Sequence, residues 1–234
     1  MADLNQTSNP KKIPWYRTTW GILSILVTIF VISFILAFAF YINRRVNQIA
    51  TENQAKSAQA ELEQNKTLIN GLNPYYLGTT TPKITIVEFG DFACPYCYDS
   101  FTAVRDLAAL YPDKVKIVWR DFLGHEDSLG LALAARCAGE QGKFWEMHDG
   151  LFLHQGDLSE ENIVALATKN NLDITQFNDC LSQKKYASSV AKDQLDASRL
   201  GVTGTPTWFV NNGYRIEGAL GLDNLKTIVE KLDK

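Results

Sequence analysis

A run of 23 residues without a single charge, Trp20 to Ile42, constrains this chain more than any other feature of its sequence. As a helix rising ~1.5 Å per residue, the run would reach roughly 34 Å and cross a hydrocarbon core of about 30 Å. Aromatic and basic residues mark its two ends: Trp15, Tyr16 and Trp20 on one side, and Tyr41, Arg44 and Arg45 on the other. Such residues anchor helices at membrane interfaces. We therefore expect a transmembrane helix over residues 20–42 rather than the buried helix of a soluble protein.

The sequence is less direct on whether this segment is cleaved and on its orientation in the membrane. Ala37-Phe38-Ala39 fits the small-x-small pattern of a cleavage site, but the apolar run is longer than the ~7 to 15 residues of a usual signal-peptide core. We therefore expect an uncleaved anchor. Basic residues are equally frequent on the two sides of the run: Lys11, Lys12 and Arg17 precede it, and Arg44, Arg45 and Lys56 follow it. The positive-inside rule therefore gives no orientation.

Charge and composition limit what the remainder can be. The chain has 23 Lys and Arg against 26 Asp and Glu; residues 1–42 carry +2 and residues 43–234 carry −5 of the total −3. A net negative domain argues against binding to nucleic acid. Residues 43–70 lack Gly and Pro and favour a helix, which Gly71 and Pro74 would end. Their irregular apolar spacing favours a solvated stalk over a coiled coil.

The pattern after the stalk is that of an α/β domain. A loop at residues 73–82 precedes a strand (84–89), a helix (95–110) and a second strand (115–122). Strand, helix and strand in this order predict a parallel pair with a right-handed crossover. Helical patterns fill residues from about 126 to 200, with turns at Gly156 and Asn170-Asn171. A hairpin (207–211 and 214–218, joined across Asn212-Gly213) and a final helix (222–232) complete the pattern.

Cys94-Pro95-Tyr96-Cys97 stands where the first strand gives way to a helix. Pro95 suits the first helical turn, which makes Cys94 the N-cap residue, next to unpaired backbone N–H groups and the positive end of the helix dipole. A thiolate is stabilised there, so we expect the pKa of Cys94 below the free value of about 8.5. Cys97 lies on the same helix face and can form a disulfide with Cys94. The pair predicts a dithiol–disulfide switch.

A zinc half-site and two ordinary structural thiols are the alternatives for this pair. Zinc normally takes four ligands, but Cys137 and Cys180 lie far apart in the sequence, and the histidines (125, 148 and 154) show no paired spacing. Redox chemistry is therefore favoured, and we expect no metal and no other cofactor. A second motif, Gly201 to Thr207, contains Thr205-Pro206 at the start of the hairpin, a place that favours a cis X-Pro bond.

With these motifs, the sequence resembles the thioredoxin superfamily, and within it the DsbA-like thiol-disulfide oxidoreductases with an inserted helical domain. The matching stretches are VEFGDFACPYC, HEDSLGLALAARCAGEQGKFWEMHDGLF and GVTGTPTWFVNNGY, within residues from about 80 to 234. The resemblance implies that Cys94 is the nucleophile, Cys97 the buried resolving cysteine, and Thr205-Pro206 a cis-proline loop against the disulfide. Substrate backbone would pair with that loop, and Pro95 and Tyr96 would border the same site.

The resemblance also implies that Glu88 is the acidic residue below the active site. Ile84, Ile86 and Glu88 share one strand face, and a carboxylate buried there is costly unless it serves proton transfer. A solvated glutamate at the strand end is the alternative. The Pro-Tyr dipeptide departs from the Pro-His of the strongly oxidising enterobacterial members, and Thr205 stands where they have Val. Because potentials among such proteins span roughly 150 mV, the direction of electron flow stays open.

Cys137 and Cys180 remain outside the motif. They are either two buried free thiols or, in an oxidising compartment, a structural disulfide that closes a loop of about 43 residues. His125, Trp145 and His148 match family positions, but we expect core or capping roles for them rather than chemistry.

We expect a thioredoxin fold with an inserted all-helical subdomain, preceded by one transmembrane helix and a helical stalk. The expected parts are a cytoplasmic tail (1–19), the anchor (20–42), the stalk and linker (43–80), and the catalytic domain (81–234). The expected function is that of an extracytoplasmic oxidoreductase that donates the Cys94–Cys97 disulfide to reduced secreted or envelope proteins. A quinone-linked membrane oxidase would reoxidise it. The alternatives are a reductase or isomerase, and a non-enzymatic chaperone-like protein that binds peptides at the envelope.

Overall fold

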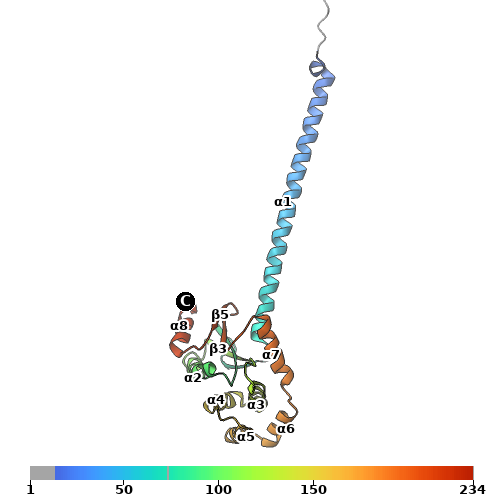
Figure 1. Cartoon of the computed structure of the whole chain (residues 1–234). Helices are drawn as coiled ribbons and strands as arrows, with labels where there is room; N and C mark the ends of the chain where they lie inside the picture. Colours follow the sequence, from blue (N-terminus) through green and yellow to red (C-terminus); the bar gives the residue numbers. More distant parts are fainter. Residues whose placement is uncertain (1–13, 73, 234) are drawn as a thin grey trace, which may run out of the picture. The chain divides into compact units, whose positions relative to one another are not determined.

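A computed structural model describes residues 14–72 and 74–233 (Figure 1). Lys11 and Lys12 lie outside the described residues, as does the side chain of Trp15. Two compact units are present, the first extending to Ala60 and the second comprising Glu61–Lys234. The second unit therefore begins about 20 residues before residue 81, the expected start of the domain.

The amino-terminal unit is dominated by one helix. A 3₁₀ turn, η1 (Trp15–Arg17), precedes α1 (Thr19–Asn70), a continuous helix of 52 residues. Its apolar portion is long enough to cross a membrane, and its side chains there are exposed. The expected apolar helix and the expected helix over residues 43–70 are thus parts of a single element, because no Gly or Pro separates them.

The second unit is built on a five-stranded sheet in the order β1-β3-β2-β4-β5. The strands are β1 (Tyr75–Gly78), β2 (Ile84–Gly90), β3 (Val115–Asp121), β4 (Thr207–Val210) and β5 (Tyr214–Glu217). β2 and β3 are parallel and are connected through α2 (Pro95–Leu110), which confirms the predicted strand–helix–strand unit. The other three pairings are antiparallel. This mixed sheet with helices confirms the predicted fold class.

Five helices form the predicted insertion between β3 and β4. They are α3 (Ser128–Glu140), α4 (Phe144–Leu153), α5 (Glu160–Lys169), α6 (Ile174–Ser182) and α7 (Ala187–Arg199). Ser159 and Asp173 cap α5 and α6 by accepting hydrogen bonds from the backbone N–H groups of Asn162 and Gln176, so each of these helices starts with one of its free donors satisfied. The chain ends with α8 (Leu222–Leu232).

Side chains alternate between two layers along β2. Ile84 and Ile86 join the apolar cluster that includes side chains of α2 and α8, whereas Val87 and Phe89 join a cluster with Ile69, at the end of α1, and with residues of α7. The sheet is therefore covered on both faces, which explains why nearly every residue of β2 and β3 is buried rather than every second one.

The region expected to be the loop 73–82 contains a strand, and this prediction was wrong. β1 pairs with β3 in an antiparallel register that sets Tyr75 opposite Trp119. The ring of Tyr75 stacks on that of Phe144 with 3.9 Å between centroids, and only alternate residues of β1 are partly buried. A four-residue edge strand gives little periodic pattern, and its stability comes from partners that are distant in the sequence.

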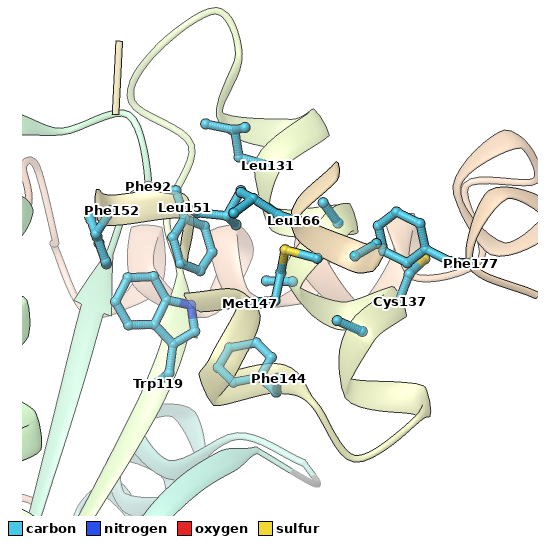
Figure 2. Close-up of a cluster of buried hydrophobic side chains, with 14 of the residues drawn as sticks. Phe92, Trp119, Leu131, Cys137, Phe144, Met147, Leu151, Phe152, Leu166 and Phe177 are labelled. Carbon is cyan, nitrogen blue, oxygen red and sulfur yellow. The ribbon is translucent and has the colours of Figure 1, made fainter. Parts of the chain in front are cut away.

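The largest apolar cluster connects the sheet to the helical insertion (Figure 2). Phe92 is central to it, because its ring lies 4.7 Å from Trp119 and 5.2 Å from Phe152 between centroids. A fully buried aromatic side chain of this kind contributes about 1.5 to 3 kcal/mol to folding. Cys94 and Cys97 belong to the same cluster, so the packing of the insertion holds the cysteine segment in place.

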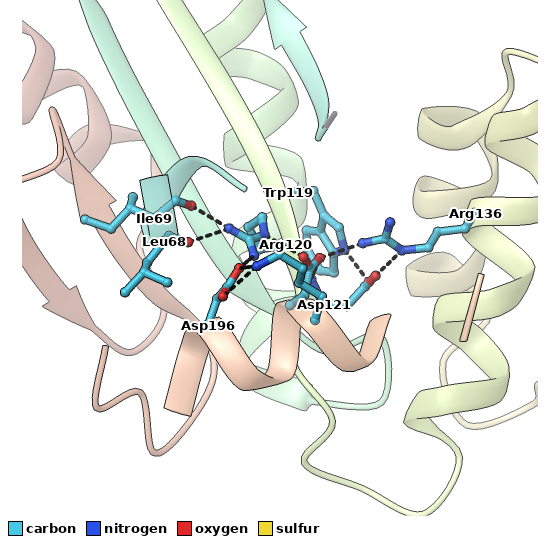
Figure 3. A network of polar contacts seen from close by, with 9 residues as sticks. Leu68, Ile69, Trp119, Arg120, Asp121, Arg136 and Asp196 are labelled. Carbon is cyan, nitrogen blue, oxygen red and sulfur yellow. Dashed lines mark hydrogen bonds and ion pairs between the residues drawn. The ribbon is translucent and has the colours of Figure 1, made fainter. Parts of the chain in front are cut away.

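A buried ionic network ties the end of α1 to β3 and α7 (Figure 3). The Arg120 guanidinium donates to the carbonyl oxygens of Leu68 and Ile69 at 2.6 and 2.9 Å, and to Asp193 and Asp196 at 2.8 Å each. These carbonyls belong to the last turn of the helix, whose carbonyl groups have no partner within the helix. The end of α1 is therefore an integral part of the second unit and not a solvated stalk.

Candidate active site

Cys94 occupies the position that the sequence predicted for it. β2 ends at Gly90, and α2 begins at Pro95, with Cys94 as the N-cap residue in an extended backbone conformation. The backbone N–H groups of Cys97 and Tyr98 donate to the Cys94 carbonyl oxygen at 3.1 and 3.2 Å, which closes the first helical turn. The Cys94 side chain therefore lies at the amino end of α2, next to the free backbone N–H groups of the first helical turn.

Both cysteines are free thiols here, and their acidities differ strongly. The pKa of Cys94 is lowered to about 5, chiefly by a hydrogen bond from the Cys97 side chain, with further bonds from Thr205 and from the backbone of Cys97 and Tyr96, against an opposing effect of burial. The pKa of Cys97 is raised far above its usual value, first by burial and then by the hydrogen bond that the Cys97 side chain donates to Cys94. Cys94 is thus a thiolate at neutral pH, while Cys97 keeps its proton.

Glu88 lies buried on β2, with 2% of its surface exposed. Its pKa is raised well above the usual 4.5, first by burial and then by the negative charge of Cys94. The charge of Glu88 in turn contributes to the raised pKa of Cys97. The alternative of a solvated glutamate at the strand end is wrong, because helices cover this face of the sheet.

Thr205 and Pro206 form the other wall of the site. The peptide bond between them is cis, and the Cys94 Sγ lies 3.4 Å from the Thr205 carbonyl oxygen. Pro206 is buried at the start of β4, whereas Pro95 and Tyr96 are exposed beside Cys94. The structure therefore brings together seven of the predicted site residues: Glu88, Cys94, Pro95, Tyr96, Cys97, Thr205 and Pro206.

Two residues that sequence reasoning missed also hold the cysteine segment. The Gln155 Nε2 donates to the carbonyl oxygens of Phe92 and Cys94 at 2.8 and 3.0 Å, so the loop after α4 is fastened to the active site. Asp91 accepts a hydrogen bond from the backbone N–H of Ala93, and its own N–H points to the Cys97 Sγ at 3.5 Å. Asp91 lies within the quoted VEFGDFACPYC stretch, which could have drawn notice to it, whereas nothing in the sequence marks Gln155.

The other candidates lie away from these atoms. Cys137 of α3 and Cys180 of α6 form a disulfide with 5.8 Å between their Cα atoms. His148 is buried in the aromatic cluster, and burial lowers its pKa. Its Nδ1 lies 3.0 Å from Asp149, and its Nε2 has no hydrogen-bond partner in the described part of the chain. Among the described residues there is no cluster of His, Cys, Asp and Glu side chains able to hold a metal ion.

Comparison with known families agrees with this geometry. Residues 70–231 match the family model Thioredoxin_4, which is described as thioredoxin. The chain belongs to the thioredoxin family. The match begins at the last residue of α1, consistent with the observation that this helix end is packed into the second unit.

Solved structures share the fold of the second unit. The thiol-disulfide exchange protein alpha-DsbA2 from Wolbachia pipientis is similar with a TM-score of 0.66 at 24% identity, covering 77% of this chain and 98% of that one. A thioredoxin-like oxidoreductase from Silicibacter pomeroyi has a TM-score of 0.64 at 28% identity and covers 71% of this chain and 96% of that one. The second unit of this chain therefore has the fold of the DsbA-like proteins.

Curated relatives of this chain include proteins that are named Na(+)/H(+) antiporters. The Na(+)/H(+) antiporter NhaA 1 of Salinispora arenicola is 38% identical over 155 residues, which are 65% of this chain and 24% of the antiporter. The chain thus spans about a quarter of the length of the curated relatives that it matches.

Proposed function

We propose that this chain is a membrane-anchored thiol–disulfide oxidoreductase that donates the Cys94–Cys97 disulfide to proteins outside the cytoplasm. The observation that carries this proposal is the pKa of Cys94, lowered to about 5. A thiolate that is stable at neutral pH favours the reduced form of the pair over its disulfide, which makes the disulfide an acceptor of electrons. The oxidised chain would then pass its disulfide on to substrate thiols.

The first half of the reaction concerns Cys97. A substrate thiolate attacks the Cys94 Sγ of the oxidised chain, a new S–S bond forms, and the Cys94–Cys97 bond breaks with Cys97 leaving as a thiolate. This leaving group needs a proton, because burial raises the pKa of Cys97 strongly. Glu88 is the buried acid whose own raised pKa keeps a proton available below the pair.

The second half of the reaction depends on Cys94. A second substrate thiolate attacks the substrate sulfur of the mixed disulfide, and Cys94 leaves as a thiolate, which its low pKa makes a good leaving group. Two electrons pass from the substrate dithiol to the Cys94–Cys97 pair. The dithiol must then be oxidised by a partner, for which we propose a quinone-linked membrane oxidase.

The second disulfide supports the proposed location. Cytosolic reductants keep thiols reduced, whereas the Cys137–Cys180 disulfide fits an oxidising compartment. We propose that α1 spans the membrane once, that the amino terminus is cytoplasmic and that residues 43–234 lie outside. Labelling of Cys94 in intact cells with an impermeant thiol reagent, after mild reduction, tests this; labelling only after lysis would place the domain inside.

The activity itself is tested by mixing the oxidised full-length chain, in detergent micelles, with a reduced peptide that contains two cysteines. The wild-type chain should convert the peptide to its disulfide, and Cys94→Ser should abolish this conversion. A Cys94→Ser chain that still oxidises the peptide would refute the enzymatic proposal and favour a peptide-binding protein. A wild-type chain that only reduces disulfides would favour the reductase alternative.

A further inference from the structure

The carboxylate of Asp91 connects the cysteine segment to the loop that precedes α3. Asp91 is buried, with 2% of its surface exposed. Its Oδ1 accepts the backbone N–H of Ala93 at 2.9 Å, and its main-chain carbonyl accepts the N–H of Cys94 at 3.0 Å. Asp91 and Cys94 are therefore the first and fourth residues of one tight turn, and any group held by the Asp91 side chain lies beside the start of α2.

The group that Asp91 holds is His125. The Oδ2 of Asp91 lies 2.7 Å from the His125 Nδ1 and 2.7 Å from the Ser128 Oγ, and it also accepts the backbone N–H of Gly124 at 3.0 Å. A carboxylate oxygen can only accept, so the imidazole donates through Nδ1. The His125 side chain is 46% exposed, whereas the Asp91 side chain that holds it is buried.

The charges of this pair and of Cys94 act on one another. The hydrogen bond to Asp91 is the largest cause of the raised pKa of His125; burial opposes it, and the negative charges of Asp91 and Cys94 add smaller effects in the raising direction. The attraction is mutual, so an imidazolium at this place favours the thiolate of Cys94. The other charged groups close to His125 in the chain are Glu126 and Asp127, which follow it directly.

We propose that Asp91 and His125 form a positioning pair that places a positive charge beside Cys94 and thereby stabilises its thiolate. This inference rests on the proposed function and deepens it, since it assigns part of the reactivity of Cys94 to a residue outside the cysteine motif. The donors described above, from Cys97, Thr205 and the backbone, are neutral. His125 adds a charge, and a charge of this kind is screened by salt.

The test compares variants of the reduced full-length chain in detergent micelles. The readout is the rate at which iodoacetamide modifies Cys94 at pH 4, below its pKa, where the rate is proportional to the fraction of thiolate. His125→Gln keeps a hydrogen-bond donor and removes the charge, so it should slow the reaction about two- to five-fold, the size expected for one exposed charge pair. His125→Lys retains a positive charge and should recover at least half of the loss.

Two controls separate charge from structure. Ser128→Ala removes one of the three hydrogen bonds to the same Asp91 oxygen and the bond that the Ser128 Oγ accepts from the His125 backbone N–H. It changes no charge, so it should leave the rate within about a third of wild type. His154→Gln removes an exposed imidazole whose Nδ1 bonds the Gly150 carbonyl, and it should have no effect. In 1 M salt the wild-type rate should fall toward that of His125→Gln, whose own rate should hardly change.

The outcomes are distinguishable. Equal slowing in His125→Gln and Ser128→Ala, or no slowing in His125→Gln, would overturn the positioning pair while the proposed function stands. A wild-type Cys94 whose pKa lies near that of a free thiol would instead refute the proposed function, whatever the histidine variants do.

Discussion

Replacement of the buried acid below the cysteines should stabilise the protein in a manner that depends on pH. Glu88 is buried, and its folded-state pKa is raised well above the usual 4.5. The folded state therefore binds this proton more tightly than the unfolded state does. The contribution of Glu88 to the free energy of unfolding is most favourable below pH 4.5, and it is lost as the pH rises from 4.5 toward the folded-state pKa of Glu88.

The magnitude follows from linkage. Where the folded chain keeps Glu88 protonated and the unfolded chain does not, each pH unit between 4.5 and the raised folded-state pKa costs about 1.36 kcal/mol of unfolding free energy. Glu88→Gln carries no titrating proton and escapes this cost. The variant should match the wild type near pH 4, and its advantage in unfolding free energy should grow by about 1.36 kcal/mol per pH unit above 4.5 until the pH reaches the folded-state pKa of Glu88.

Urea unfolding followed by tryptophan fluorescence measures this difference from pH 4 to pH 8. Both chains should carry Cys94→Ser and Cys97→Ser, so that no thiol titrates and the Cys137–Cys180 disulfide stays intact without reductant. Burial, the larger cause of the raised pKa of Glu88, remains in this background. Parallel stability curves for the two chains, or a variant that is less stable at pH 7, would refute the argument that Glu88 is a buried acid.

Three further changes have defined outcomes. Cys97→Ser removes the resolving thiol, so the Cys94 thiolate of this variant should attack a disulfide-bonded substrate, release one substrate thiolate and accumulate as a mixed disulfide, visible on non-reducing gels; the absence of such species would argue against Cys94 as the attacking residue. Arg120→Met leaves two buried aspartates and two helix-end carbonyls without their hydrogen-bond donor, and it should lower the free energy of unfolding in urea by about 3 to 5 kcal/mol. The control Lys192→Met removes an exposed partner of Asp196 and should lower it by less than about 1 kcal/mol. Cys137→Ala opens a 43-residue loop and should lower stability by about 4 kcal/mol; a loss below about 1 kcal/mol would show that the disulfide does not support the insertion.

The sequence predicted those parts of the fold whose stability is local. The apolar run of α1, the proline that starts α2 and the helical pattern of the insertion are all encoded in short windows, and each is found at the expected place. The hairpin is also local, and its loop contains Asn211 and Asn212 at positive φ, a conformation that asparagine tolerates.

The features that were missed depend on contacts between distant residues. β1 is held by pairing with β3 and by the stacking of Tyr75 on Phe144. The end of α1 is held by Arg120, some 50 residues further along the chain. Gly71 follows this helix end with φ of +67°, and a Cβ there would meet the Arg120 side chain at 2.6 Å. Neither the partner nor the close approach can be inferred from a helical pattern that ends with glycine.

The candidate site shows the same division. The spacing of Cys94 and Cys97 and the N-cap position are written in four consecutive residues, and they suffice to predict a lowered pKa for Cys94. The structure adds the cause that the sequence could not supply, because the largest contribution is the hydrogen bond from Cys97. His125, expected to have a structural role, is brought to the site only through the carboxylate of Asp91.

The reduction potential of the Cys94–Cys97 couple tests the central claim most directly. Equilibration of the full-length chain with glutathione buffers, followed by alkylation of Cys94 and mass measurement, gives this potential. A Cys94 thiolate stabilised to a pKa of about 5 predicts a value closer to the ~−120 mV of a strong disulfide donor than to the ~−270 mV of thioredoxin. A value at or below about −270 mV would contradict the account and identify the chain as a reductant.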